Sequence, residues 1–113
     1  MSYIRNAMLA AILSVGLAGA AHALAFKNIQ GKWCGVTTNY EFSADALNVT
    51  FLDGSSPLTF KVAGYDYSDD TVTMHWFNQD KPLFTEFGEF SADGATMVQL
   101  KSEVGPRRPF HRC

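Results

Sequence analysis

The sequence predicts an all-β fold, a small antiparallel up-and-down meander barrel of seven or eight strands. Three observations favour it: alternating hydrophobicity, turn-forming residues at short spacings, and no sustained helical period after residue 25. Val72, Met74 and Trp76, for example, would share one face of a strand. A strand that alternates in this way buries one face against a core. Short connections favour neighbouring hairpins, and closure into a barrel removes exposed strand edges.

The strands are expected in an unbroken series along the chain. Their predicted ranges are 31–38, 39–43, 46–52, 58–67, 71–77, 83–90 and 95–102, with a last extended piece at 109–113. Three segments repeat an aromatic strand end, a turn with Ser and Asp and an alternating strand, and they begin at Tyr40, Tyr65 and Gly88. We interpret the repeat as three β-hairpins in series, although Ser and Asp are common at turns and the repeat can also arise by chance.

Residues 1–25 predict a secretory signal peptide rather than part of the fold. Arg5 supplies a positive start, residues 7–21 are uncharged and apolar, and small-x-small cleavage sites end at Ala23 and Ala25. A transmembrane anchor is the alternative, but the apolar run is short and no basic stop-transfer cluster follows it. We therefore expect a single β domain at 26–113, periplasmic or secreted, with no transmembrane anchor after cleavage.

Cys34 and Cys113 are the only cysteines, and they lie near the two ends of the predicted domain. Export would deliver them to an oxidising compartment, where an even pair normally forms a disulfide. Two free thiols or an intermolecular bridge are the alternatives. A metal site is not expected, because neither His75 nor His111 has ligand spacing to a cysteine.

Composition and motifs narrow the function classes. Hydrophobic residues make up 47% of the chain and aromatic residues 13%, which favours a packed core over disorder. The formal charge of -2 provides no broad basic surface for nucleic acid. The sequence holds no Gly-x-Ser-x-Gly, no His-Glu-x-x-His and no Gly-rich phosphate loop. We expect a protein that is not an enzyme and needs no cofactor.

The opening of the domain resembles a known family. Gly31-Lys32-Trp33 carries the Gly-x-Trp that begins the first strand of lipocalins and of small bacterial lipocalin-like domains, and the following hairpin pattern is similar to theirs. The resemblance implies a barrel with Trp33 at its base and a basic residue near the chain end packed over that ring. Here the basic residue would be Arg112, brought close by a bridge to the neighbouring Cys113, in a cation–π contact. In so short a chain, we expect side chains to fill the interior, which leaves little room for the ligand cavity of the family.

The basic tail is the most suggestive surface feature. Arg107, Arg108, His111 and Arg112 stand close together in an otherwise acidic protein. Such a patch could dock an acidic partner, a lipid head group or a polysaccharide. The alternative is a final strand whose arginines pair with local carboxylates or cover Trp33.

Aromatic residues are numerous for so small a barrel. Trp76 and Phe77 are adjacent, and Phe84 and Phe87 also occupy mixed faces, so some must lie outward or at a rim. An outward cluster would mark a partner or dimer interface, and a core with both faces partly covered is the alternative.

These observations predict an exported, non-catalytic binding protein. It would hold a partner protein or an anionic envelope component through Trp76, Phe77 and the basic tail, and a homodimer is possible. One alternative is a lipocalin-like carrier of a small apolar ligand, which requires a real cavity, of roughly 300 Å³ or more for a drug-sized molecule. A second alternative is a small secreted hydrolase, which requires His75 to lie near a Ser or an Asp.

Overall fold

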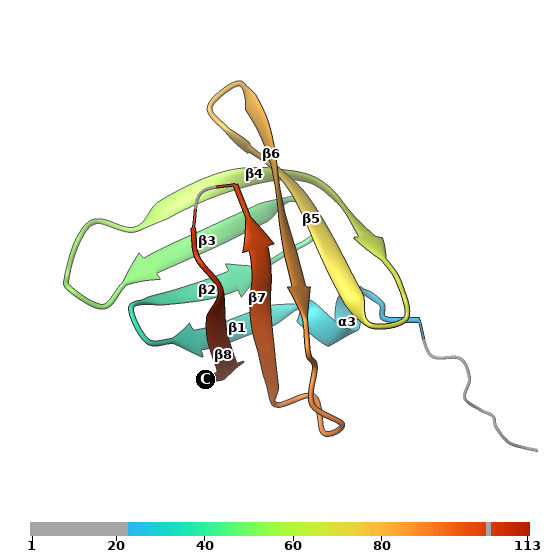
Figure 1. The fold of residues 1–113 in the computed structure, drawn as a ribbon. Helices are drawn as coiled ribbons and strands as arrows, with labels where there is room; N and C mark the ends of the chain where they lie inside the picture. The colour runs from blue at the N-terminus through green and yellow to red at the C-terminus, as the bar shows by residue number, and fades with distance from the viewer. Residues whose placement is uncertain (1–22, 104) are drawn as a thin grey trace, which may run out of the picture.

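Eight antiparallel strands and one short helix make up the residues that the computed structural model describes, 23–103 and 105–113 (Figure 1). The helix is α3 (Phe26–Ile29), and the strands are β1 (Gly31–Gly35), β2 (Thr38–Phe42), β3 (Ala46–Phe51), β4 (Leu58–Tyr67), β5 (Thr71–Asn78), β6 (Lys81–Gly88), β7 (Thr96–Ser102) and β8 (Arg108–Arg112). Each strand pairs with the next, and β8 pairs back with β1, so the sheet closes into a barrel. The predicted all-β meander is confirmed, with eight strands. It is compatible with a lipocalin-like fold.

Helix α3 is the element that the hydrophobic pattern did not predict. It is four residues long, too short to show a helical period. The Asn28 side chain accepts a hydrogen bond of 2.8 Å from the backbone amide of Ala25 and so caps the first turn. The Phe26 ring packs against Tyr65 of β4, and Ile29 is fully buried. The helix therefore covers one end of the barrel, which we call the closed end.

The repeated Ser and Asp segments form three turns at this same end, because the chain returns to it at every second connection (Figure 1). They join β2 to β3, β4 to β5 and β6 to β7. In each turn a serine hydroxyl donates to the aspartate two residues later: Ser43 to Asp45 at 3.5 Å, Ser68 to Asp70 at 3.3 Å and Ser91 to Asp93 at 2.6 Å. The repeat in the sequence thus corresponds to three hairpins in series.

The first predicted strand ends earlier than expected. Residues 36–37 form a turn between β1 and β2 instead of continuing the strand to residue 38. The turn is tight because Gly35 has no side chain. A Cβ there would lie 2.5 Å from the carbonyl oxygen of Thr38 and 2.7 Å from the Phe110 ring.

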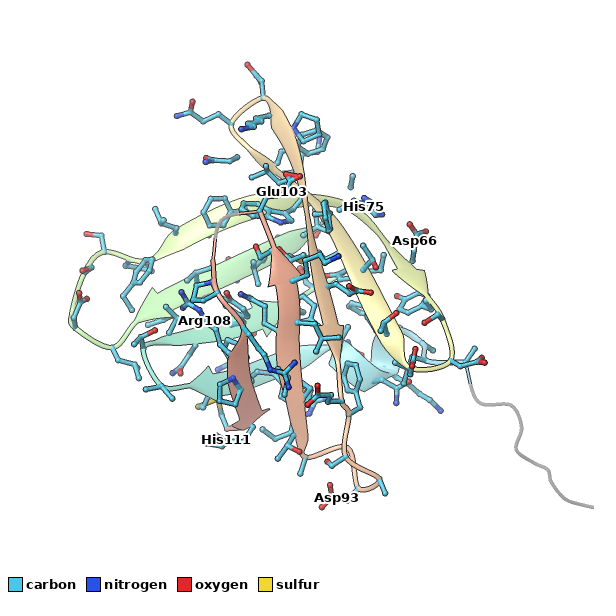
Figure 2. All side chains as sticks on the ribbon, in the orientation of Figure 1. Asp66, His75, Asp93, Glu103, Arg108 and His111 are labelled. Carbon is cyan, nitrogen blue, oxygen red and sulfur yellow. A yellow bond between two sulfur atoms is a disulfide. The ribbon has the colours of Figure 1, made fainter. Side chains whose placement is uncertain are left out.

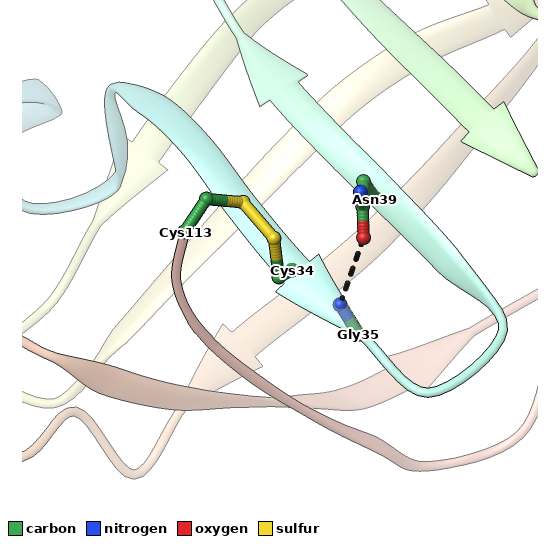
Figure 3. Close-up of a disulfide and its surroundings, with 4 residues drawn as sticks. All are labelled: Cys34, Gly35, Asn39 and Cys113. Carbon is green, nitrogen blue, oxygen red and sulfur yellow. Dashed lines mark hydrogen bonds between the residues drawn. A yellow bond between two sulfur atoms is a disulfide. The ribbon is translucent and has the colours of Figure 1, made fainter. Parts of the chain in front are cut away.

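The predicted disulfide between Cys34 and Cys113 is confirmed, with a Cα–Cα distance of 5.0 Å (Figure 3). It links β1 to the residue that follows β8. The β1–β8 ladder that closes the barrel holds only three residue pairs. Beside the bridge, the Gly35 amide donates to the Asn39 side chain at 3.2 Å. The covalent bond therefore lies at the shortest part of the closure.

The predicted signal peptide at 1–25 lies almost wholly outside the described residues. Leu24 is described: its amide donates to the Ser68 carbonyl at 3.0 Å, and its side chain packs against the core. Cleavage after Ala25 would remove these contacts, whereas cleavage after Ala23 would keep them. In residues 23–103 and 105–113, no helix has the length and apolar character needed to span a bilayer.

Candidate functional site

The end of the barrel opposite α3 is hollow. A cavity of about 260 Å³ opens there, with apolar walls formed by Leu47, Val49, Phe60, Met74, Trp76 and Phe87. The expectation that side chains fill the interior is correct at the closed end, where Trp33 and Phe42 are fully buried, and wrong at the open end. The reason is side-chain size, because the inward-facing positions near the opening include small residues: Thr38, Thr85, Ser102 and Gly105.

A chain of hydrogen bonds crosses one wall of the cavity. The Tyr40 hydroxyl donates to the Gln99 side-chain oxygen at 2.9 Å, and the Gln99 amide nitrogen donates to the Pro106 carbonyl at 3.0 Å. Thr38 lies near the Tyr40 hydroxyl, but its own hydroxyl oxygen is buried without a hydrogen bond of ordinary geometry to any described residue. The Thr38 hydroxyl thus has only a weak contact with Tyr40, which is unusual for a buried polar atom in a folded protein.

Arg108 of β8 lines the same cavity and is half-buried (Figure 2). One of its terminal nitrogens donates to the Thr37 hydroxyl at 3.3 Å. Within the described residues, no carboxylate lies within ion-pair distance of this guanidinium. Burial raises the pKa of Tyr40, whereas the positive charge of Arg108 and the interaction with the Thr38 side chain lower that pKa in part.

The opening is rimmed by exposed apolar side chains. Val36 is 78% exposed, Leu52 is 54% exposed and Leu58 is 47% exposed. A surface groove of about 490 Å³ runs beside Val36 and Leu52, and Phe51 and Arg108 line both the groove and the interior cavity. Arg108 therefore stands between the interior cavity and this groove, whose lining also includes the carboxylate residue Asp53.

The predicted basic tail does not form one patch, because alternate residues of a strand face opposite sides. Arg107 pairs with Glu89 on the outside at 2.6 Å. His111 is exposed on the outer face, whereas Arg108 lines the cavity (Figure 2). Arg112 lies at the closed end. The four residues expected to act together are thus divided among three places.

Arg112 lies over the Trp33 ring at 4.0 Å, as the resemblance implied. It also donates to the backbone carbonyl of Asn28 at 3.2 Å and to that of Gln30. The Trp33 indole donates to the Ile29 carbonyl at 2.8 Å. Gly31 has a φ of 96°, in the left-handed region, and a Cβ there would approach Arg112 at 3.4 Å. Gly31, Trp33 and Arg112 therefore build the closed end.

The expected surface position of Trp76 is wrong. Its ring is 6% exposed and faces inward, where its indole donates to the Thr85 hydroxyl at 3.0 Å. Trp76 also packs edge-on against Phe60. Phe77 points outward and is partly buried, in agreement with the mixed faces. The alternation of Val72, Met74 and Trp76 already placed Trp76 on the core face.

His75 and Asp66 form a pair on the outer face of β4 and β5, with 2.6 Å between the ring nitrogen and the carboxylate (Figure 2). Both side chains are well exposed, at 48% and 78%. Asp66 thus meets the condition that His75 lie near a Ser or an Asp. A hydrolytic site also needs a nucleophile against the histidine, and within the described ranges no serine or threonine hydroxyl is hydrogen-bonded to His75. In the same residues, no group of three or more His, Cys, Asp or Glu side chains is arranged to hold a metal ion.

The cavity residues Thr38, Tyr40 and Gln99 were missed as site residues at the sequence level. Alternation around Tyr40 places Thr38, Tyr40 and Phe42 on one face, and this signal could have pointed to two of them. Gln99 follows the same rule in β7, where Met97 and Gln99 are buried and the alternate residues Val98 and Leu100 are only half-buried. Polar residues at core-facing strand positions were therefore the sequence signal that could have predicted this cavity site.

Comparison with protein-family models, with curated proteins and with solved structures found no match for this chain.

Proposed function

We propose that this chain is an exported, non-catalytic binding protein that holds one small amphipathic molecule in the open half of its barrel. The observation that carries the proposal is the cavity, which combines apolar walls with a few convergent polar groups, the usual composition of a small-molecule site. At ~30 Å³ for each water-sized group, its volume of about 260 Å³ holds roughly nine such groups. This volume lies slightly below the roughly 300–1,000 Å³ of ordinary small-molecule sites, so the ligand is compact.

This proposal reverses the order of the two leading hypotheses from the sequence. Docking of a partner through Trp76 and the basic tail requires these residues to share a surface. Trp76 instead lines the cavity, and Arg112 is committed to Trp33. A carrier of a drug-sized molecule would need roughly 300 Å³ or more, and the cavity of about 260 Å³ is slightly smaller, so the ligand that we propose is smaller than a drug-sized molecule.

The proposal also includes a lipocalin-like fold and an extracytoplasmic location, and both are supported by the sequence together with the structure. The Gly31, Trp33 and Arg112 arrangement supports a small lipocalin-like domain, as does the eight-stranded meander. The disulfide fits a periplasmic or extracellular protein, because such bonds persist in oxidising compartments. Residues 1–25 would supply the signal peptide.

Two measurements on the exported protein test the proposal. Native mass spectrometry of freshly purified material is expected to show a small organic adduct, and titration with octan-1-ol or octanoate followed by saturation-transfer NMR is expected to show binding. Val49→Phe places a larger ring in the cavity and is expected to abolish binding. Thr50→Phe, the adjacent outward position on β3, is the matched control and is expected to bind as the wild type does.

Leu58→Trp at the exposed opening is a second blocking variant, in case the larger ring at residue 49 prevents folding. Absence of an adduct together with absence of octan-1-ol and octanoate binding would overturn the proposed function. Equal binding by the wild type and by a folded Val49→Phe variant would also overturn it, because the ligand would then lie elsewhere.

A further inference from the structure

We infer that the ligand is a monoanionic amphiphile, such as a medium-chain or arylalkyl carboxylate, whose acidic group is held by Arg108 at the opening of the cavity. This inference rests on the proposed function and specifies the chemical class of its ligand. Three features of the site support it: the charge of Arg108, the nitrogen donors beside Gly105 and the apolar walls of the cavity.

Two neighbouring arginines differ in their charge partners. Arg107 and Arg108 are adjacent in sequence, but within the described part of the chain only Arg107 has a carboxylate partner, Glu89, at the protein surface. Arg108 is half-buried beside apolar side chains, and among residues 23–103 and 105–113 its side chain donates a hydrogen bond to the neutral Thr37 hydroxyl. A guanidinium presents five donors in a fixed fork and always stays charged, so a hydroxyl leaves most of its capacity unused.

Several nitrogen donors surround the space beside Gly105. A Cβ built on Gly105 would lie 3.5 Å from one terminal nitrogen of Arg108, 3.6 Å from the Gln99 amide nitrogen and 3.9 Å from Nε of Arg108. Nitrogen donors from β7 and β8 therefore converge on one point, and the absence of a side chain at residue 105 keeps that point accessible. Carboxylates are bound by such convergent N–H groups, with guanidinium as the preferred partner.

The buried hydroxyl of Thr38 is the second polar feature that points to a ligand. Like Arg108, it lines both the interior cavity and the surface groove beside Val36 and Leu52. It has no hydrogen bond of ordinary geometry to any residue of the described ranges. A ligand oxygen at the opening would give this hydroxyl a partner after a small rotation of its side chain.

The apolar walls set the direction of the ligand. From Arg108 the cavity continues inward to Met74 and Phe87, which belong to the core. A hydrocarbon group that enters this space leaves its acidic group at the opening, beside Arg108. Among the described residues, Arg108 is the one charged side chain that lines the cavity, and Asp53 adds a negative charge to the adjoining groove. This balance favours a singly charged carboxylate over a dianionic phosphate.

The test compares octanoate with octan-1-ol, which share a hydrocarbon chain and differ in charge. At neutral pH the wild type is expected to bind octanoate at least about tenfold more tightly than octan-1-ol, in keeping with hydrogen bonds to a charged group. Arg108→Gln is expected to weaken octanoate binding by about 10- to 100-fold and to change octan-1-ol binding by less than about twofold. Arg107→Gln, the matched control, is expected to change neither affinity.

The outcomes separate this inference from the proposed function. If the wild type binds both molecules equally well and Arg108→Gln changes neither, the cavity is a ligand site and the assignment of an anionic ligand is wrong. If the wild type binds neither molecule, the proposed function itself fails. The comparison of the two ligands on the wild type decides the question even if Arg108→Gln does not fold.

Discussion

At the scale of single residues, Arg112 shows how one side chain can connect three parts of a fold. Its guanidinium covers the Trp33 ring of β1, and its donors reach backbone carbonyls at residues 28 and 30, at the end of α3. Burial lowers the pKa of Arg112, but the group stays charged at neutral pH because the ordinary value is far above 7. The tail residue that the sequence offered for docking is therefore part of the closed end.

Arg112→Gln is expected to destabilise the protein by about 1–3 kcal/mol, since it removes the cation–π contact and charge-assisted hydrogen bonds. Arg107→Gln removes an exposed ion pair with Glu89 and is expected to cost only about 0–1 kcal/mol. Urea unfolding of the two variants measures both values. Equal losses would contradict the structural role assigned to Arg112.

At the scale of elements, alternation and turn residues predict most of the strands. The range 58–67 was predicted without error for β4, and the boundaries of β5 and β3 differ by one residue each. The sequence could not reveal α3, because one helical turn has no period. It could not reveal the β-bulges between Val62 and Gly64 and between Glu86 and Phe87 either, because these depend on how neighbouring strands pair.

The turn between β6 and β7 provides a prediction about acid stability. Asp93 accepts hydrogen bonds from the Ser91 hydroxyl at 2.6 Å and from the Ala95 amide at 3.0 Å. These two hydrogen bonds lower the pKa of the Asp93 carboxyl, and the bond from Ser91 has the larger effect. A carboxyl with a lowered pKa in the folded state contributes stability above its unfolded pKa, near 3.8, and this contribution disappears as the pH falls through the folded value.

Asp93→Asn is therefore expected to reduce the loss of stability between neutral pH and acid, because the amide does not titrate. Ser91→Ala is expected to have an effect in the same direction, and the double variant is expected to add little to either. Thermal unfolding of the four proteins at neutral pH and near pH 3 checks this. A wild-type acid dependence that persists unchanged in Asp93→Asn would show that the turn contributes nothing to it.

At the scale of the whole molecule, the barrel closes with a ladder of three residue pairs, whereas β5 and β6 share eight. The sequence predicted the bridge between Cys34 and Cys113 and its location at the first and last strands, because the two cysteines lie near the domain ends. It could not predict the cavity. The empty volume depends on which inward positions carry small side chains after closure, and alternation reports only the face on which a residue lies.

The double variant Cys34→Ser, Cys113→Ser removes the covalent part of this closure. In the chain-entropy model, a bridge enclosing a loop of this length stabilises the fold by about 4–5 kcal/mol. That is close to the whole net stability of a small domain, so the variant is expected to be marginally folded at room temperature. Because the β1–β8 ladder is so short, we expect it to open before the rest of the sheet does.

Hydrogen exchange followed by mass spectrometry measures the order of opening. In the variant, amides of β8 and β1 are expected to exchange faster than those of β5 and β6, whereas in the oxidised wild type the four strands are expected to differ less. Uniform acceleration over all eight strands would show that the sheet opens as one unit. A loss of stability below about 1 kcal/mol in urea would show that the three-pair ladder and the packing of Trp33 and Phe110 suffice to close the barrel.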